Sequence, residues 1–264
     1  MVTRLTPIEI LEKLVSFPTV SSQSNLPLID WVEDYFAAHG ITSHRYCHES
    51  EPKAALFAHV GPQIKGGVLL SGHTDVVPVE GQNWSTDPFV LTEKEGLLYG
   101  RGSCDMKGFD ALAIWAMVEA TSRPLSRPLQ IALSFDEEVG CTGAPPMIAR
   151  IVDVLPKAEI VIVGEPSMMQ VVTSHKGSQA HITHIVGHEV HSSTPHLGVS
   201  AIMEAGRLID WANWINEANS DKSPTEVDLL FDPPWSTAHV GTIHGGTAQN
   251  ITAGSCKFGL DFRV

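Results

Sequence analysis

The chain has 264 residues, of which 43% are hydrophobic and 18% charged, enough for one large or two smaller domains with a sizeable core. Its formal net charge of −13 argues against nucleic acid and anionic membrane surfaces as partners, because both repel an acidic protein. Four widely spaced cysteines, no apolar run of about 18 residues and no signal-peptide pattern predict a cytoplasmic protein with free thiols.

The first part of the chain predicts alternating strands and helices. Thr6–Glu9 has the pattern of a capping box with proline at the first helical position, and the helix that follows is expected to carry Ile8, Leu11, Leu14 and Val15 on its apolar face. A second helix is expected over 27–40. Further strands are predicted at 54–60, 68–70, 129–135 and 159–163, and helices at 108–120 and 144–154. This order is typical of an α/β sandwich.

The pattern changes after Lys176–Gly177, where a separate small α+β domain is predicted. A strand at 179–186, a helix at 199–216, a loop at 216–234 and strands at 237–244 and 255–264 are expected. We therefore predict two domains, 1–176 and 177–264. The sequence stops inside a strand-like pattern, so we expect both domains to be incomplete at the carboxyl end.

Four polar clusters lie where an apolar strand gives way to a turn or where a loop enters a helix. His73 and Asp75 follow one strand, Glu137 and Glu138 follow another, and Glu165 follows a third. A fourth cluster, containing Asp105, precedes a helix. Because ligands bind at the carboxyl ends of strands in open α/β sheets, these clusters are expected to share one cleft.

The residue types in these clusters favour metal chemistry. His73 and Asp75, two residues apart, suit a ligand and the carboxylate that orients it, although a lone His-x-Asp more often makes structural hydrogen bonds. Glu137 and Glu138 suit one general base and one ligand. Alternatively, they could form an acidic helix start stabilised by the helix dipole.

Charge balance favours two cations. Asp105, Glu138 and Glu165 supply three negative charges, a hydroxide would supply a fourth, and His73 is neutral, which together match two dications. Nitrogen and oxygen ligands fit zinc, with cobalt or manganese as substitutes. Asp105 could bridge the two ions through its two oxygens.

The chain resembles the dinuclear zinc aminoacylase and deacetylase family in SGHTDVVPV, GQNWSTDPF, LYGRGSCDMKG, SFDEEVGCTGA and VGEPS, which occur in family order. Together with VVTSHKG, these motifs are most similar to the acetylornithine deacetylase branch. The resemblance implies a zinc-exopeptidase-like mixed-sheet α/β catalytic domain with an inserted, smaller α+β lid and dimerisation domain. It also implies hydrolysis of an N-acyl amino acid, with N-acetyl-L-ornithine favoured over acetylcitrulline or succinyl-diaminopimelate.

The resemblance assigns roles to the cluster residues. It implies that His73, Asp105 and Glu165 hold one zinc ion, and that Asp105 and Glu138 hold the other. Glu137 would be the general base and Asp75 would orient His73.

The resemblance extends to the second domain. It implies that His191 stabilises the oxyanion, often from the partner subunit of a homodimer, and that Arg263 grips the substrate carboxylate. Asn250 ends the Gly-Gly-Thr-x-x-Asn motif and is expected to contact the substrate. The family pattern is Gly-His-Ser-Ser, whereas Val190 precedes His191 here, which puts the shape of this loop in question.

One family feature is missing. The remaining zinc ligand of the family is a histidine from a region beyond the lid domain, and no such region is present. The resemblance therefore implies a chain that lacks one ligand. The alternative reading is a non-catalytic, dimerising or metal-binding fragment with partial metal occupancy.

Overall fold

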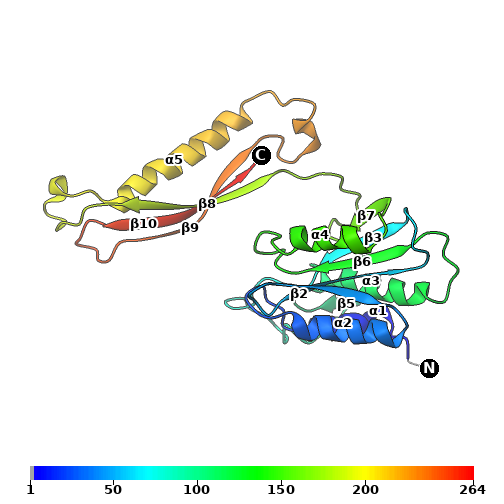
Figure 1. Cartoon of the computed structure of the whole chain (residues 1–264). Coiled ribbons are helices and arrows are strands. Elements are labelled where there is room, and N and C mark those ends of the chain that lie inside the picture. The colour runs from blue at the N-terminus through cyan, green and yellow to red at the C-terminus, as the bar shows by residue number, and fades with distance from the viewer. Residues whose placement is uncertain (1–2) are drawn as a thin grey trace. The chain divides into compact units, whose positions relative to one another are not determined.

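The computed structural model describes residues 3–264 and contains two compact units, which divide between Gln170 and Val171 (Figure 1). The domain boundary expected from the sequence, at Lys176–Gly177, lies slightly further along the chain. Of the helices that the structure describes, none combines the length and apolar character needed to cross a membrane.

The first unit is built on a five-stranded mixed sheet. Its strand order is β1-β2-β6-β3-β7. The strands span Ser43–Cys47 (β1), Ala54–Val60 (β2), Val68–His73 (β3), Leu129–Ser134 (β6) and Ile160–Val163 (β7). β3 runs parallel to both β6 and β7, whereas β2 is antiparallel to β6 and to β1. The predicted mixed α/β architecture is confirmed, and the three parallel strands end at one edge of the sheet.

Helices cover both faces of this sheet, α1, α2 and α3 on one side and α4 on the other (Figure 1). They span Pro7–Val15 (α1), Leu26–Ala38 (α2), Lys107–Ala120 (α3) and Ala144–Val154 (α4). Successive residues of β2 point to opposite faces, so Leu56 packs among α1 to α3 while Phe57 packs with Met147 and Ile151 of α4. Burial on both faces explains why β2 is a continuous apolar run rather than an alternating one.

The capping box of α1 is present, and one part of its predicted face is wrong. The Thr6 hydroxyl accepts from the Glu9 backbone and the Glu9 carboxylate accepts from the Thr6 N–H. Ile8 is 54% exposed, whereas Ile10 is fully buried. The buried face is formed by Ile10 and Leu14 and by Leu11 and Val15, two pairs whose members are four residues apart. Ile8 lies outside this face.

Three short strands were not predicted, because their sequences lack an apolar pattern. β1 contains mostly polar, half-exposed residues. β4 (Thr92–Lys94) and β5 (Leu97–Tyr99) form a hairpin. Glu95 and Gly96 connect them with φ of 55° and 76°, the pair of positive values that a two-residue type I′ turn requires.

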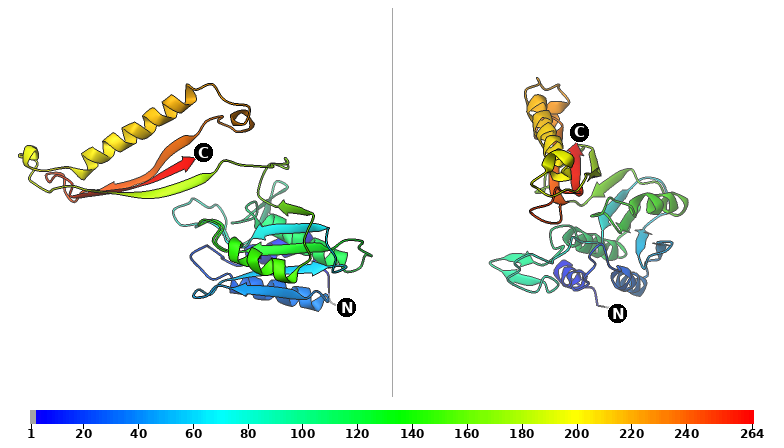
Figure 2. Two further views of the ribbon diagram at one scale, coloured as in Figure 1. Left: turned by 45° about the horizontal axis from the view of Figure 1, so that its top comes forward. Right: turned by 90° about the vertical axis from the view of Figure 1, so that its left-hand side faces the viewer.

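The second unit consists of an antiparallel sheet of order β8-β10-β9 with one long helix along it (Figure 2). Its strands span Ser178–Val186 (β8), Thr237–Gly245 (β9) and Ser255–Arg263 (β10), its helix α5 spans Ala201–Ser220, and two short 3₁₀ helices span Pro195–Leu197 (η1) and Asp228–Leu230 (η2). α5 continues past the predicted loop start at Asn216. The amides of Asn216 and Asn219 bond to the backbone of Ala238 and Ser236, which ties the last turn of the helix to the start of β9.

Candidate metal centre

The predicted ligands of the first unit converge at the edge where its three parallel strands end. His73 is the last residue of β3. Glu137 and Glu138 follow β6, and Glu165 follows β7. Asp105 lies in the loop that enters α3. A single edge therefore collects side chains from four distant segments, as the sequence predicted.

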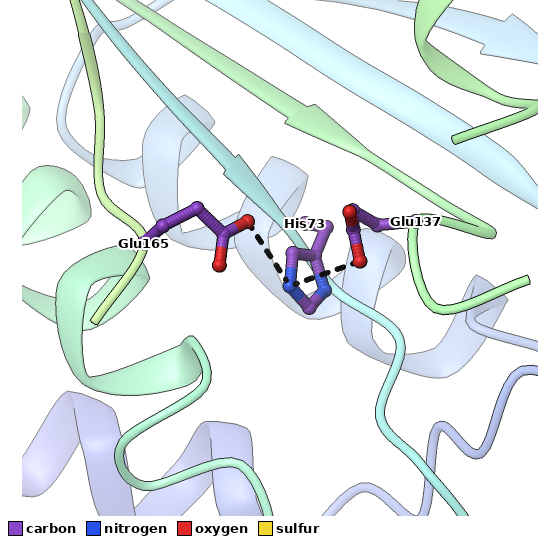
Figure 3. A group of neighbouring side chains, drawn as sticks. All are labelled: His73, Glu137 and Glu165. Atoms are coloured by element: carbon purple, nitrogen blue, oxygen red, sulfur yellow. Dashed lines mark ion pairs between the residues drawn. The ribbon is translucent and has the colours of Figure 1, made fainter. Parts of the chain in front are cut away.

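The His73 imidazole lies at the middle of the cluster. Its Nε2 is 3.1 Å from Asp105 Oδ1, 3.7 Å from Glu165 Oε1 and 4.0 Å from Glu137 Oε2. Figure 3 shows the imidazole flanked by the two glutamates, which reach it from opposite sides. His73 is only 2% exposed, whereas the side chains of Asp105, Glu137 and Glu165 are 47%, 34% and 44% exposed.

The potential ligand atoms fall into two overlapping groups. One group is His73, Glu137 and Glu165, and the other is His73, Asp105 and Glu138; within each group, the ligand atoms all lie within 4.8 Å of one another. His73 is common to both groups, whereas Asp105 is the residue that the family resemblance places between the ions. Each group has the nitrogen and oxygen donors that divalent transition metals accept.

Asp75 connects two sides of the cluster. Its backbone carbonyl lies 2.9 Å from His73 Nδ1, and its carboxylate Oδ1 lies 3.5 Å from the same atom. The two carboxylate oxygens also accept from the backbone N–H groups of Glu137 and Glu138, at 3.1 and 3.3 Å, and Oδ2 accepts from the Ser21 hydroxyl at 2.7 Å. One buried carboxylate thus fixes the histidine and the turn after β6.

The pKa values of the cluster are shifted by burial and by the negative charge gathered there. Burial alone would lower the pKa of His73, but the hydrogen bond and charge of Asp75, with the charges of Asp110 and Glu165, raise it to about 10. Burial, followed by the charge of Asp105, raises the pKa of Glu138. Burial likewise raises the pKa of Glu165, and Asp105 adds to that rise against the opposing charge of His73.

Over residues 3–264, neither lysine nor arginine forms an ion pair with Asp105, Glu137, Glu138 or Glu165. Among the described residues, a protonated His73 is the cationic group that contacts Asp105, Glu137 and Glu165. A cluster of this composition fits one or two divalent cations, which would supply the missing positive charge.

Two glycines allow the first turn of α3 to approach the ligands. A Cβ at Gly72, directly before His73, would lie 2.0 Å from Asp110 Oδ1. A Cβ at Gly164, directly before Glu165, would overlap the Phe109 ring at 1.9 Å. The neighbouring side chains Phe109 and Asp110 therefore occupy the space that these glycines leave open, which holds α3 against both ligand-bearing strands.

Asp110 is the most isolated ionisable group near the cluster. It is 1% exposed, and neither of its carboxylate oxygens has a hydrogen-bond partner among the residues described. Burial, with smaller contributions from the charges of Glu165 and Asp75, raises its pKa to about 8. Its negative form is therefore suppressed around neutral pH.

The three predicted site residues of the second unit lie in two separate regions of it. His191 and Asn250 are close: the chain pairs at His191 and Ile251, and the Ser192 N–H donates to the Asn250 carbonyl at 2.9 Å. Arg263 lies at the far end of β10, where its Nε bonds Asp261 Oδ2 at 2.9 Å. Since β10 runs from Ser255 to Arg263, Arg263 lies about 25 Å from the His191 end of the unit.

Sequence reasoning missed the residues that support the cluster. Ser21 donates to Asp75, and Lys53 binds Asp136 at the start of the turn after β6. Lone serines and lysines carry no spacing signal. Asp110 was detectable in principle, as a carboxylate in the apolar segment GFDALAIW.

Comparisons with known proteins agree on one family. Residues 69–262 match the model described as peptidase family M20/M25/M40. An acetylornithine deacetylase from Myxococcus xanthus is 37% identical over 258 residues, covering 96% of this chain and 65% of the relative. This chain thus spans about two thirds of that relative's length.

Solved structures show the same fold. An M20 metallo-carboxypeptidase from Sulfolobus solfataricus superposes with a TM-score of 0.78 at 17% identity, covering 98% of this chain and 71% of that one. A dinuclear metal-binding M20 peptidase from Bacillus subtilis gives a TM-score of 0.58 at 14% identity, with coverage of 98% and 63%.

Proposed function

Because the chain belongs to peptidase family M20/M25/M40, we propose that its first unit binds two divalent cations and that the whole protein hydrolyses the amide bond of an N-acyl amino acid. The observation that carries this proposal is the convergence of one imidazole and four carboxylates, unpaired by lysine or arginine in the described chain. The resemblance to acetylornithine deacetylases favours N-acetyl-L-ornithine as the substrate.

The two cation sites would differ in the number of ligands. His73, Asp105 and Glu165 would hold one ion with three side chains, while Asp105 and Glu138 would hold the other with two. We propose zinc, with cobalt or manganese as substitutes, because the donors are nitrogen and oxygen. Bound cations would polarise the scissile carbonyl and lower the pKa of water in the site.

Glu137 would act as the general base. Its side chain is 34% exposed, and the Cys141 thiol contacts Oε1 at 3.1 Å while Oε2 faces His73. Oε2 would take a proton from the attacking water and pass it to the departing amine. Asp75 would hold His73 in the orientation needed for ligation.

The second unit would supply substrate contacts. The His191 imidazole would donate to the oxyanion, Asn250 would contact the substrate, and the Arg263 guanidinium would bind its carboxylate. Because His191 and Arg263 lie at opposite ends of this unit, one unit could not place both on a small amino acid. A homodimer formed through the second unit would resolve this, with His191 and Asn250 serving the partner's site.

Exposed apolar side chains on α5 support such a dimer. Met203, Trp211 and Trp214 are 72%, 39% and 60% exposed, and surfaces of this kind commonly mark protein contacts. The cysteines support a cytoplasmic location. All four are free, as is typical of proteins in a reducing compartment.

Zinc binding and turnover test the proposal together. At saturating zinc, we expect two ions per chain, with the three-ligand site tighter. Glu137→Gln is expected to keep both ions and abolish release of ornithine from N-acetyl-L-ornithine, whereas Glu138→Ala is expected to lose the weaker ion. The reverse pattern would exchange their roles.

Substrate choice separates the remaining readings. Parallel assays with N-acetyl-L-citrulline and N-succinyl-diaminopimelate identify the amino acid and acyl group. Faster turnover of either would replace N-acetyl-L-ornithine as the substrate. Zinc binding without turnover of any of the three would favour a metal-binding, dimerising fragment.

A further inference from the structure

A buried ion pair involves Asp136, the residue that immediately precedes Glu137 and Glu138 of the metal centre. Lys53 Nζ donates to both carboxylate oxygens of Asp136, at 2.8 and 2.9 Å. The two residues are 7% and 6% exposed. Lys53 precedes β2 and Asp136 follows β6, so the pair continues the antiparallel alignment of these strands, in which Leu56 faces Leu133.

Asp136 has a backbone conformation that L-residues rarely adopt. Its φ is 57°, in the left-handed region that is unfavourable for most residues with a Cβ and that aspartate and asparagine adopt more often than the others. This conformation turns the chain sharply out of β6, immediately before Glu137 and Glu138. Strained backbone persists only where surrounding contacts impose it, and the buried bidentate pair with Lys53 is such a contact.

The same turn is fixed from its other side by Asp75. The N–H groups of Glu137 and Glu138 donate to the two carboxylate oxygens of Asp75, which also lies against His73 Nδ1. The turn is therefore held between Lys53 on one side and Asp75 on the other. A change at Asp136 would move both glutamates and disturb the carboxylate that orients His73.

Stability alone gives a weak reason for this pair. Buried ion pairs often contribute no more than apolar residues of similar size, because both charges lose their hydration. The Lys53–Asp136 pair nevertheless lies at the turn after β6, which carries Glu137 and Glu138.

We propose that Lys53 is a positioning residue of the metal centre: by holding Asp136 in its left-handed conformation, it aims Glu137 and Glu138 at the bound cations. This inference rests on the proposed function, because it assumes that these glutamates face metal ions. It predicts that removing the pair weakens metal binding while the fold survives.

The informative variant removes both charges together. Lys53→Met alone would leave the Asp136 carboxylate buried without its partner, which itself could unfold the unit. In Lys53→Met/Asp136→Asn no buried charge is stranded, because the other partner of Lys53, Glu51 at 2.8 Å, has a side chain that is 51% exposed. Asparagine, like aspartate, tolerates the left-handed region. The matched control is Arg4→Met/Glu119→Gln, which removes an exposed ion pair of the same unit, at 3.0 Å, away from the cluster.

The readouts are zinc affinity, by competition with a chelator, and the visible absorption spectrum of the cobalt-loaded chain. Far-ultraviolet circular dichroism checks folding. We expect the double variant to be folded, to bind the weaker zinc ion at least about tenfold less tightly and to show an altered cobalt spectrum. The control is expected to match the original chain in all three measurements.

The outcomes separate this inference from the function on which it rests. If the original chain binds no metal, the proposed function fails and this inference fails with it. If the original chain binds metal and the double variant binds it identically, only the positioning role is overturned. A double variant that does not fold would also overturn it, because the pair would then be needed for the fold itself.

Discussion

The two units of the chain differ in how completely they bury their sheets. In the first unit, helices cover both faces of the sheet except at the exposed edge strand β7, and two buried clusters contain large side chains such as Phe36, Phe57 and Phe135. The second unit has one helix on a three-stranded sheet and a small cluster in which Phe258 is the largest buried residue. Val186, Met203 and Trp214 are 83%, 72% and 60% exposed there.

This difference matches the roles proposed for the two units, metal binding for the first and contact with a partner for the second. A metal centre needs ligands held within a few tenths of an ångström, which requires a rigid frame around them. A unit that contacts a partner needs an apolar surface to offer. If the two units differ in this way, substitutions and bound zinc should affect them unequally.

Truncating one phenylalanine in each unit should separate their stabilities most clearly. Phe57→Ala and Phe258→Ala each remove a side chain that is 1% exposed, at a cost of about 3–5 kcal/mol. We expect Phe57→Ala to lower the melting temperature of a unit that stays folded, and Phe258→Ala to unfold the second unit. Hydrogen exchange measured by mass spectrometry resolves both. Retained protection of β8 and β10 in Phe258→Ala would contradict the comparison.

Zinc should stabilise the first unit alone. A ligand present at a hundred times its Kd stabilises the state that binds it by about 2.7 kcal/mol. Zinc is therefore expected to slow hydrogen exchange around β3, β6 and β7 and to leave β8–β10 unchanged. His73→Ala should abolish this protection and His191→Ala should preserve it. Zinc-dependent protection of both units would mean that the site is not confined to the first.

The buried Asp110 should make the stability of the metal-free first unit depend on pH. Its folded pKa is about 8, against an ordinary value of 3.8, so the folded state binds this proton more tightly than the unfolded state does. The stability contributed by that proton is lost progressively as pH rises from about 4 to about 8, and the loss levels off above that. The advantage of Asp110→Asn over the original chain should therefore grow between pH 5 and 8 and stay constant from pH 8 to 9, at about 1–3 kcal/mol. A constant difference in urea unfolding across the lower of these two ranges would contradict the assignment.

The smallest effect concerns the helix caps of the two units. Thr6 caps α1 through its side chain, whereas Ser200, at the start of α5, makes no side-chain cap bond. Thr6→Ala is expected to destabilise the first unit by about 1 kcal/mol, and Ser200→Ala should change the second unit by much less. Chemical denaturation of both variants measures this. Equal losses would indicate that α5 is capped in solution.

Sequence reasoning worked best where the pattern itself has a local physical cause. The apolar runs of β2 and β6 predicted strands because both faces of the sheet are buried there, whereas the equally apolar β7 was predicted correctly although all four of its residues are exposed. The polar residues after β3, β6 and β7 predicted a shared edge because these strands are parallel. The capping box of α1 is likewise a local signal.

Contacts between distant segments could not be read in this way. Lys53 and Asp136 lie 83 residues apart, and nothing near either one signals their pairing. The end of α5 was missed because Asn216 and Asn219 look like loop residues until their bonds to the start of β9 are known. The half-exposed β1 and the β4–β5 hairpin lack the apolar alternation that identifies a strand.

We propose that four distant segments of the first unit share bound cations. The most direct measurement is anomalous diffraction at the zinc edge from crystals of the zinc-loaded chain. We expect two anomalous peaks about 3.5–4 Å apart, enclosed by His73, Asp105, Glu138 and Glu165. Zinc elsewhere, or no peak beside His73, would contradict it.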